Sequence, residues 1–284
     1  MGTFTNRTAV VTGGASGIGF GLTTAFLQAG ANVAIADVEE AALDRALAEL
    51  GEQGFGPDRV IGVRTDVRHV EDVQALADRT IETFGAVHYL CNNAGVETGG
   101  SFSQIPESAW RWVMDVNYFG VLNGCRVFLP LLEQHPDTHI VNTASVAAFA
   151  SGAPMMIPYC ASKMAILGMT ESLEAELRTN NSSVHLSVLA PGPVKTNMTN
   201  AERNRPADVP EAQEAERKAA IAQLAKVTQE VGMEPSQVAE QVLQAIEDKR
   251  FFILTHPEIA LNGIRARLNW METGEAPPLR VAGK

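Results

Sequence analysis

Short apolar runs alternate along the chain with longer stretches in which apolar positions recur every three or four residues. The short runs are rich in β-branched residues and are apolar along both faces, as is typical of strands buried between two helix layers. They predict strands at residues 8–11, 32–36, 60–65, 87–91, 139–144, 184–190 and 251–255. The longer stretches, such as VEEAALDRALAEL (38–50) and VEDVQALADRTIETF (70–84), predict amphipathic helices.

The alternation of strands and helices predicts the architecture. Repeated β–α–β units favour a parallel sheet, and right-handed crossovers place helices on both of its faces. We therefore expect an α/β fold in which residues 1–284 form a single domain. Its core would be a Rossmann-like, doubly wound parallel sheet of about seven strands. No linker or low-complexity tract divides the chain.

Two segments depart from this alternation. Residues 196–232 are polar, and their second half is helix-prone. An insertion of that length after a strand is often a functional lid, so we predict a substrate lid here. A solvated helical excursion is the alternative. Residues 257–284 predict a C-terminal extension, formed by one helix and a tail that contains glycine and proline.

Composition and charge narrow the functional classes. Hydrophobic residues make up 45% of the chain and charged residues 19%, enough for a large core. The formal net charge of −11 disfavours nucleic acid as a partner. No apolar run is long enough for a membrane-spanning helix, and the N-terminus MGTFTNRTAVV enters a strand without room for a signal peptide. We expect a cytoplasmic protein.

The cysteines and histidines give no sign of a metal site. The three cysteines, at 91, 125 and 160, form no C-x-x-C motif and predict reduced thiols. His135 and His139 have the spacing of metal ligands on a helix, but Pro136 between them argues against one shared helix. We expect no metal cofactor.

A glycine-rich loop follows the first predicted strand and precedes a helix. The sequence TGGASGIG (12–19) places Gly13, Gly17 and Gly19 in a G-x-x-x-G-x-G pattern. Glycine lets the backbone approach a pyrophosphate, and a helix N-terminus offers N–H donors to an anion. Tight turns also use glycine for geometry alone. The position between strand and helix favours dinucleotide binding.

Asp37 ends the second predicted strand, 18 residues after Gly19. Dinucleotide-binding folds place at about this distance the acidic residue that hydrogen-bonds the adenosine ribose. A carboxylate there would repel the 2′-phosphate of NADP, and the loop contains Ala15 and Ser16 rather than Arg or Lys. We therefore predict NAD as the cofactor. Alternatively, Asp37 only caps the following helix.

Further polar residues follow the third and fourth predicted strands. Asp66 and Val67 follow one, and the sequence NNAG (92–95), which contains Asn93, Ala94 and Gly95, follows the other. Ligands of open α/β sheets bind at the carboxyl ends of the strands, so these residues are candidates for the cofactor site. Asn92 could alternatively be only a turn residue.

Tyr159 and Lys163, in YCASK, lie one helical turn apart and therefore face the same side. An ammonium group beside a phenol lowers the phenol pKa, and an oxidised nicotinamide would add to this effect. Such a tyrosine can take a proton from an alcohol while a hydride leaves for the nicotinamide. Ser145, just past the fifth strand, could hold the substrate oxygen, and Asn117 could hold a water that links Lys163 to solvent. An isolated Y-x-x-x-K is usually only helix surface.

These motifs together, in order and spacing, resemble the short-chain dehydrogenase/reductase family, over about residues 5 to 255. The resemblance implies a catalytic tetrad of Asn117, Ser145, Tyr159 and Lys163. It also implies nicotinamide contacts from Val194 and Thr196 in PGPVKT (191–196), with Pro191 and Gly192 shaping that turn. Ser16 and Ile18 of the glycine loop would also approach the cofactor, as would Tyr159 and Lys163. Family members are typically cytoplasmic homodimers or homotetramers.

The segment between Ser145 and Tyr159 lines the substrate pocket in this family. Here it is apolar and contains no arginine that could bind a carboxylate. We expect a bulky, largely apolar secondary alcohol and its ketone. The candidate substrate contacts are Ser145, Phe149, Met155, Met156 and Ile157, with Met198 from the lid. Alternatively, these side chains pack against a neighbouring helix or subunit.

The substrate branch stays open, and three alternative functions have to be weighed. GGASGIGFG, NTAS and PGPVKT are similar to bacterial dehydrogenases of lignin-derived aryl ethers, and hydroxysteroid dehydrogenases are a comparable branch. A non-catalytic NAD sensor or structural subunit usually lacks the tyrosine or the lysine, and both are present here. An NADP-dependent ketone reductase would contradict the role of Asp37. A sugar epimerase or dehydratase usually has a different glycine spacing and a larger C-terminal domain.

Overall fold

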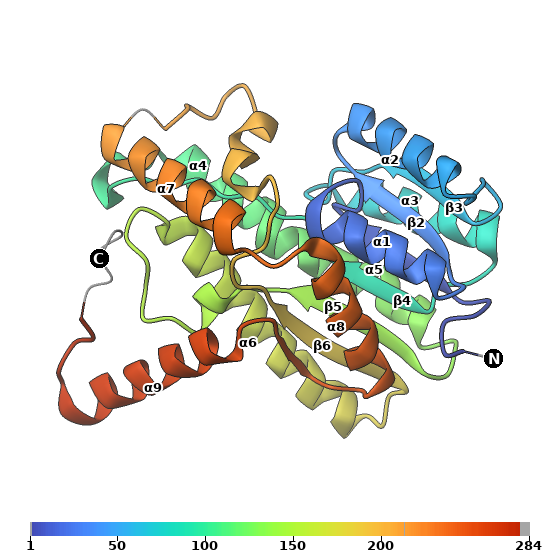
Figure 1. Ribbon diagram of the computed structural model, residues 1–284. Helices are drawn as coiled ribbons and strands as arrows, with labels where there is room; N and C mark the ends of the chain where they lie inside the picture. The colour runs from blue at the N-terminus through green and yellow to red at the C-terminus, as the bar shows by residue number, and fades with distance from the viewer. Residues whose placement is uncertain (1, 213, 279–284) are drawn as a thin grey trace.

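The computed structural model describes residues 2–212 and 214–278, which form a single Rossmann-like domain (Figure 1). All strand pairings are parallel, and the sheet order is β3-β2-β1-β4-β5-β6-β7. The predicted fold class is therefore confirmed. The strands are β1 (Thr8–Thr12), β2 (Asn32–Asp37), β3 (Val60–Arg64), β4 (Tyr89–Asn92), β5 (Thr138–Thr143), β6 (Val184–Ala190) and β7 (Phe252–Leu254).

Helices cover both faces of the sheet. One face carries α1 (Gly17–Gln28), α2 (Glu40–Glu52) and α8 (Pro235–Glu247), and the other carries α3 (Val70–Phe84), α5 (Gly120–Leu132) and α6 (Ile157–Thr179). Neighbouring residues of a strand point to opposite faces, so Val10 of β1 packs with the second group and Val11 with the first. Both faces of β1 are therefore buried, as its apolar sequence predicted.

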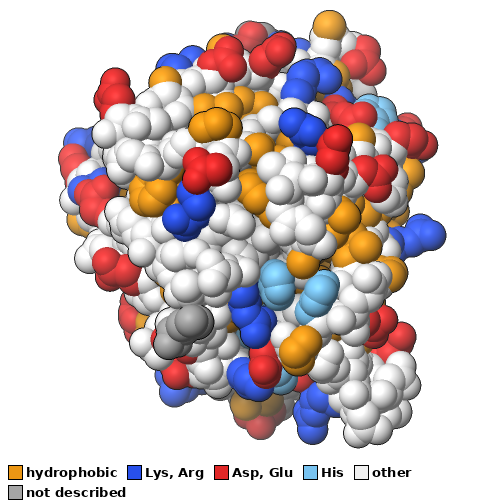
Figure 2. Space-filling model, turned by 90° about the vertical axis from the view of Figure 1, so that its right-hand side faces the viewer, with side chains coloured by type: hydrophobic (Ala, Val, Ile, Leu, Met, Phe, Trp, Pro, Cys, Tyr) orange, Lys and Arg blue, Asp and Glu red, His pale blue; other side chains and the backbone are white. Residues whose placement is uncertain are grey.

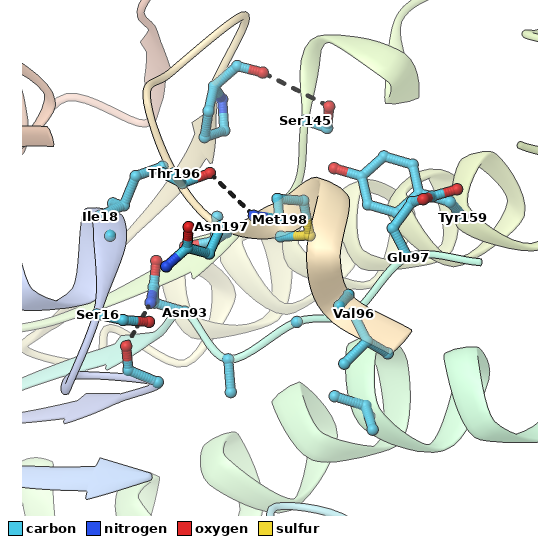
Figure 3. A pocket seen from close by; sticks show the side chains of 18 of the residues that line it. Ser16, Ile18, Asn93, Val96, Glu97, Ser145, Tyr159, Thr196, Asn197 and Met198 are labelled. Carbon is cyan, nitrogen blue, oxygen red and sulfur yellow. Dashed lines mark hydrogen bonds between the residues drawn. The ribbon is translucent and has the colours of Figure 1, made fainter. Parts of the chain in front are cut away.

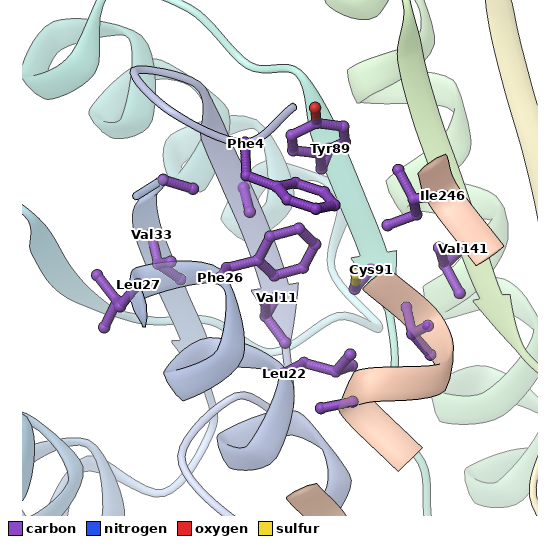
Figure 4. Close-up of a cluster of buried hydrophobic side chains, with 14 of the residues drawn as sticks. Phe4, Val11, Leu22, Phe26, Leu27, Val33, Tyr89, Cys91, Val141 and Ile246 are labelled. Carbon is purple, nitrogen blue, oxygen red and sulfur yellow. The ribbon is translucent and has the colours of Figure 1, made fainter. Parts of the chain in front are cut away.

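Figure 4 shows the core beneath α1, where three aromatic rings gather. The ring of Phe26 stacks on that of Tyr89 with 5.5 Å between centroids, and Phe4 packs edge-on against Phe26 at 5.6 Å. The hydroxyl of Tyr89 reaches the surface of this cluster and donates to the carbonyl of Thr3 at 3.1 Å. This cluster fixes α1, and with it the glycine loop, against the sheet.

The segment from 106 to 135 is not one regular helix. It consists of α4 (Glu107–Met114), a π-helical turn (Asp115–Phe119) and α5. Such turns are rare and are frequent at functional sites. Here the turn carries Asn117, which is fully buried.

The sheet order reverses between β1 and β4, because β2 and β3 lie on one side of β1 and later strands on the other. In open α/β sheets this position creates a crevice at the carboxyl ends of the strands. The 3₁₀ segment η4 (Met198–Asn204) and helix α7 (Ala215–Val231) follow β6 and lie at this end of the sheet (Figure 1). They correspond to the predicted lid.

The C-terminal helix α9 (Pro257–Thr273) confirms the helical part of the extension, and residues 279–284 lie outside the described residues. It contacts the body of the protein through Ala260 and Gly263, whereas Leu268 and Met271 are exposed. Across residues 2–212 and 214–278, no helix has both the length and the hydropathy to cross a membrane. Figure 2 shows basic side chains interspersed with acidic ones on one face, without a continuous basic patch.

The histidines with metal-like spacing lie apart from the carboxyl ends of the strands, since His135 precedes β5 and His139 is its second residue. His139 is in β5 and is buried, and its Nε2 lies 2.7 Å from Ser187 Oγ on the neighbouring strand. In the described part of the chain, no group of three or more His, Cys, Asp or Glu side chains has the arrangement of a metal site.

Candidate active site

A cavity of about 380 Å³ opens at the carboxyl ends of the strands, where the sheet order reverses. It brings together residues from the glycine loop, the strand ends, α6 and η4. The predicted residues that line it are Gly13, Ser16, Gly17, Ile18, Asp37, Asp66, Val67, Asn93, Ala94, Gly95, Ser145, Met156, Tyr159, Lys163, Pro191, Gly192, Val194, Thr196 and Met198.

The glycine loop has the geometry that its sequence suggested. Gly13 and Gly17 have φ angles of +62° and +51°, which side chains rarely tolerate. Gly19 does not line the cavity, but a Cβ there would lie 2.0 Å from the carbonyl oxygen of Gly13. Its role is to let the first turn of α1 pack against the loop. The loop thus leaves the helix N-terminus open toward the cavity, as a pyrophosphate requires.

Asp37 lies at the adenosine end expected for a dinucleotide and is almost fully buried. Its two carboxylate oxygens accept hydrogen bonds from the backbone N–H groups of Ala15 at 3.2 Å and Glu39 at 3.1 Å. Burial raises its pKa, and these backbone bonds oppose that rise. The Ala15 bond also ties the carboxylate to the glycine loop, so its position is fixed beside the cavity.

Two carboxylates rather than one stand at this end of the cavity, because Glu39 also lines it. Glu39 Oε1 accepts bonds from Arg203, whose nearest nitrogen lies 2.8 Å away, and from Asn204 Nδ2 at 2.8 Å. Burial opposes the effect of these donors, which together lower the pKa of Glu39. No local sequence pattern predicted this contact, which joins η4 to the residues that directly follow β2.

Asp66 and Asn93 are held by local bonds. Asp66 forms an ion pair of 2.6 Å with Arg68, which lowers the Asp66 pKa against the opposing effect of burial. Asn93 Nδ2 donates to the carbonyl of Thr12 at 3.0 Å, so the segment after β4 is tied to the end of β1. Both residues therefore line the cavity in fixed positions.

Tyr159 and Lys163 face the cavity from the first turns of α6, as their spacing predicted. Lys163 is buried, and its Nζ lies 5.6 Å from the centre of the Tyr159 ring. Burial lowers the pKa of Lys163 to about 7 and raises that of Tyr159 to about 12. The expected lowering of the Tyr159 pKa is therefore not found in this structure, because burial is the stronger influence.

Ser145 lies beside Tyr159 in Figure 3, and its hydroxyl is directed toward the carbonyl of Pro191 at 3.5 Å. A hydrogen bond from Ser145 partly offsets the rise in the Tyr159 pKa. Ser145 Oγ also accepts from the backbone N–H of Ala147 at 3.1 Å. The serine thus caps the 3₁₀ turn Val146–Ala148, which fixes its hydroxyl at the end of β5.

Asn117 does not line the cavity. Its Oδ1 accepts from the backbone N–H of Val96 at 2.8 Å, and its Nδ2 donates to the Val96 carbonyl at 3.0 Å and to Ser162 Oγ at 2.9 Å. A Cβ added at Gly95 would lie 3.4 Å from Asn117 Oδ1 and 3.5 Å from Lys163 Nζ. Asn117 therefore fixes the Gly95–Val96 backbone directly beside Lys163.

Three expected substrate contacts lie elsewhere. Phe149 is buried in the core and packs edge-on against Phe252, with 6.2 Å between ring centroids, so its assignment to the pocket was wrong. Met155 and Ile157 do not line the cavity either. The segment turns at Met155, whose φ is +65°, so that Met156 alone of these side chains reaches the cavity.

Sequence reasoning also missed residues that line the cavity. Val96, Trp112 and Leu224 add apolar surface, and Glu97 adds a buried carboxylate. Glu97 directly follows the NNAG sequence and Val96, so its proximity to that motif was an available signal. Its partner Arg217 lies 120 residues away and could not be found from spacing.

Comparisons with known proteins show which family the chain belongs to. The family described as short chain dehydrogenase matches residues 7–207. The chain is 33% identical over 261 residues to a C alpha-dehydrogenase of Sphingobium, covering 91% of this chain and 83% of that protein. It is 42% identical over 195 residues to a 1-deoxy-11-beta-hydroxypentalenate dehydrogenase of Streptomyces exfoliatus, covering 68% and 69% of the two chains.

A solved structure is similar over nearly the whole length. It is a short chain dehydrogenase/reductase from Burkholderia phymatum in complex with NAD, with a TM-score of 0.92 and 40% identity. The alignment covers 99% of this chain and 100% of that one. The chain described here therefore belongs to the short chain dehydrogenase/reductase family of oxidoreductases.

Proposed function

We propose that the protein transfers a hydride between NAD(H) and a bulky, largely apolar secondary alcohol and its ketone. The observation that carries this proposal is the convergence of Ser145, Tyr159 and Lys163 on the cavity that also contains the glycine loop and Asp37. A cavity with proton-transfer groups at one end and a dinucleotide cradle at the other suits coupled proton and hydride transfer.

The residues of the chain supply the proton chemistry. Tyr159 Oη takes the alcohol proton during oxidation and returns it during reduction. Ser145 Oγ positions the substrate oxygen beside the phenol, and Lys163, when it is protonated, favours the phenolate against the burial that raises the Tyr159 pKa. Asn117 acts as a positioning residue through the Val96 backbone. The nicotinamide of a bound cofactor supplies or accepts the hydride, and its positive charge in the oxidised form also favours the phenolate.

The adenosine end favours NAD over NADP. Asp37 and Glu39 both line the cavity there, and two carboxylates would repel a 2′-phosphate. Arg203 and Arg68 line the cavity, and each is paired with a carboxylate, Arg203 with Glu39 and Arg68 with Asp66. The Burkholderia phymatum relative was solved with NAD, which supports the same assignment.

The substrate end is apolar and is partly formed by the proposed lid. Met156, Met198, Trp112 and Leu224 line it, and methionine adapts to irregular ligands. Two relatives are named as a C alpha-dehydrogenase and a hydroxypentalenate dehydrogenase. We place the substrate in the same broad class of hydroxylated, bulky molecules, with aryl-ether benzylic alcohols, steroids and alicyclic alcohols as the members to test.

The test is reduction of NAD, compared with NADP, by the purified protein and a panel of benzylic, aryl-ether, steroid, alicyclic and short aliphatic alcohols. We expect NADH formation with a bulky member and at least about tenfold lower kcat/KM with NADP. A preference for NADP would indicate the ketone-reductase alternative. NAD binding without turnover of any alcohol, or of the matching ketones with NADH, would instead support the sensor alternative.

We also propose that the protein is a cytoplasmic homodimer or homotetramer. The exposed apolar side chains of α9 support an assembly, and they are Leu261, Ile264, Leu268, Trp270 and Met271. Cys91, Cys125 and Cys160 are free and buried, which fits a reducing compartment. Light scattering of the purified protein would give its mass, and a monomer at micromolar concentration would contradict the assembly.

A further inference from the structure

Glu97 is a buried carboxylate at the substrate end of the cavity. Its side chain is 2% exposed, and the residue lines the cavity together with Tyr159 and Met156. Figure 3 shows Glu97 on the same side of the cavity as Tyr159, away from Ser16 and Asn93 of the cofactor end. Its carboxylate contrasts with the apolar side chains of Met156, Met198, Trp112 and Leu224, which also line the cavity.

Glu97 is paired with a residue of the proposed lid. Arg217, from the first turn of α7, donates from Nη2 to Glu97 Oε2 at 2.5 Å, and its side chain is only 3% exposed. Arg217 Nη1 also donates to the carbonyl of Met155 at 3.2 Å. The guanidinium therefore joins α7, the segment after β4 and the turn before α6, and it balances the charge of Glu97.

The second oxygen of this carboxylate has no donor. Glu97 Oε1 is buried and has no hydrogen-bond partner among the described residues. Leaving a buried acceptor unsatisfied destabilises a protein, and the effect is larger for a charged group. Glu202, bonded to Thr98 Oγ1 at 2.8 Å, is a further acid near Glu97 and cannot satisfy it as a carboxylate. Burial raises the pKa of Glu97, and Arg217 opposes that rise.

We infer that Glu97 is a specificity-determining residue, whose Oε1 accepts a hydrogen bond from a second hydroxyl group of the substrate. This second hydroxyl belongs to the bound substrate, and it reaches Glu97 Oε1 when α7 closes over the substrate. A neutral hydroxyl suits this site better than an ammonium group, because Arg217 already balances the carboxylate charge. The preferred substrate is then a largely apolar secondary alcohol that carries one further hydroxyl. This inference rests on the proposed dehydrogenase function.

The test compares matched pairs of benzylic secondary alcohols, with and without one additional hydroxyl. The hydroxyl is placed on the ring, on the carbon next to the carbinol, or one carbon further. With NAD, the wild-type protein should show kcat/KM about tenfold to a hundredfold higher for the hydroxylated member of at least one pair, because a hydrogen bond to a charged group is strong.

The first variant is the double substitution Glu97→Met with Arg217→Met. Replacing a buried ion pair by apolar residues of similar size is often tolerated, whereas removing one partner leaves a buried charge. The ratio of kcat/KM for the hydroxylated member to that for the other member should fall to about onefold, whatever change in kcat/KM the two members share. If the ion pair had a purely structural role, the double substitution would lower kcat/KM equally for both members of a substrate pair. The matched control is Glu107→Met with Arg111→Met, an exposed ion pair of 2.6 Å on α4.

Glu97→Gln keeps the shape of the side chain, and it is the variant to compare with the wild type if the double variant does not fold. A neutral acceptor forms a weaker bond, so the preference should fall several-fold. Equal kcat/KM within every pair in the wild-type protein would overturn the inference and leave the dehydrogenase function intact. If no member is oxidised, the proposed function fails instead. In that case the change in melting temperature of the NAD-loaded protein is measured with each member of a pair, which tests binding at Glu97 without turnover. Equal changes for the two members of every pair would overturn the role of Glu97 in specificity.

Discussion

The Nζ atom of Lys163 lies 5.6 Å from the centre of the Tyr159 ring while it donates a 2.9 Å hydrogen bond to the carbonyl of Thr143. That bond anchors the lysine to the end of β5, two residues before Ser145. The three groups that we propose for proton transfer, Ser145, Tyr159 and Lys163, are therefore fixed by one strand end and one helix. This arrangement leads to the first two predictions.

Tyr159→Phe should lower turnover by about two to four orders of magnitude, because it removes the group that accepts the proton. NAD binding, followed by protein fluorescence, should remain within a few-fold of the wild-type value. Tyr89→Phe is the matched control, since it removes a tyrosine hydroxyl that bonds Thr3 far from the cavity. Near-normal turnover by Tyr159→Phe would remove the tyrosine from the mechanism.

Lys163 should make the stability of the protein pH-dependent. Its pKa is about 7 in the folded chain and ~10.4 when unfolded, so the unfolded state binds more protons between these values. The free energy of unfolding should therefore rise with pH across this window, by at most ~1.4 kcal/mol per pH unit. Above pH ~10 the raised pKa of Tyr159 acts in the opposite direction.

Lys163→Met removes this contribution. The measurement is urea denaturation, without added cofactor, of the wild-type protein and the variant at several pH values between about 7 and 10. The difference in unfolding free energy between the two should grow in favour of the wild type as pH rises. A difference that is constant across this range would show that Lys163 keeps its charge in the folded protein.

Asp37→Ser combined with Glu39→Gln should raise the ratio of kcat/KM for NADP to that for NAD by at least about tenfold. Both substitutions remove a negative charge that would repel the 2′-phosphate, and like charges brought together cost several kcal/mol. They also leave Arg203 without its carboxylate partner. Asp44→Asn, on the exposed face of α2, is the control for lost charge. An unchanged ratio would mean that neither carboxylate selects the cofactor.

Arg203→Met should speed the release of NADH by about two- to fivefold, because a partly exposed ion pair contributes at most ~1 kcal/mol. The pair joins η4 to the end of β2, so its loss should loosen η4 over the adenosine end of the cavity. Stopped-flow fluorescence after mixing with excess NAD measures this rate. Arg111→Met breaks an exposed ion pair on α4 and should leave the rate of NADH release unchanged. A wild-type release rate in Arg203→Met would show that Arg203 does not hold η4 over the cavity.

Phe149→Ala should reduce the free energy of unfolding by about 3–5 kcal/mol, because it opens a cavity in the core. The variant should retain kcat/KM at temperatures where it stays folded, since Phe149 does not line the active-site cavity. Met156→Ala should show the opposite pattern, with altered kcat/KM and a smaller loss of stability. Urea denaturation and steady-state kinetics of both variants distinguish a core residue from a pocket residue. If Phe149→Ala lowered kcat/KM without lowering stability, Phe149 would be a pocket residue after all.

The sequence by itself determined the features that depend on local periodicity. Strands apolar on both faces and the alternating helices predicted the parallel sheet, because burial between two layers requires that pattern. The glycine loop, Asp37 and the pair Tyr159 and Lys163 lie at the strand ends and the helical turn where their sequence patterns predicted them, because each position is set locally. The carboxyl ends of parallel strands then necessarily meet at one edge.

Only the tertiary structure decided the features that depend on packing between distant segments. Phe149 and Met156 lie in one apolar segment, and its turn at Met155 sends the first into the core and the second into the cavity. The contact between Glu39 and Arg203 spans 164 residues, and that between Glu97 and Arg217 spans 120. No local period links such partners, because their distance is set by how the segment after β6 folds back over the strand ends.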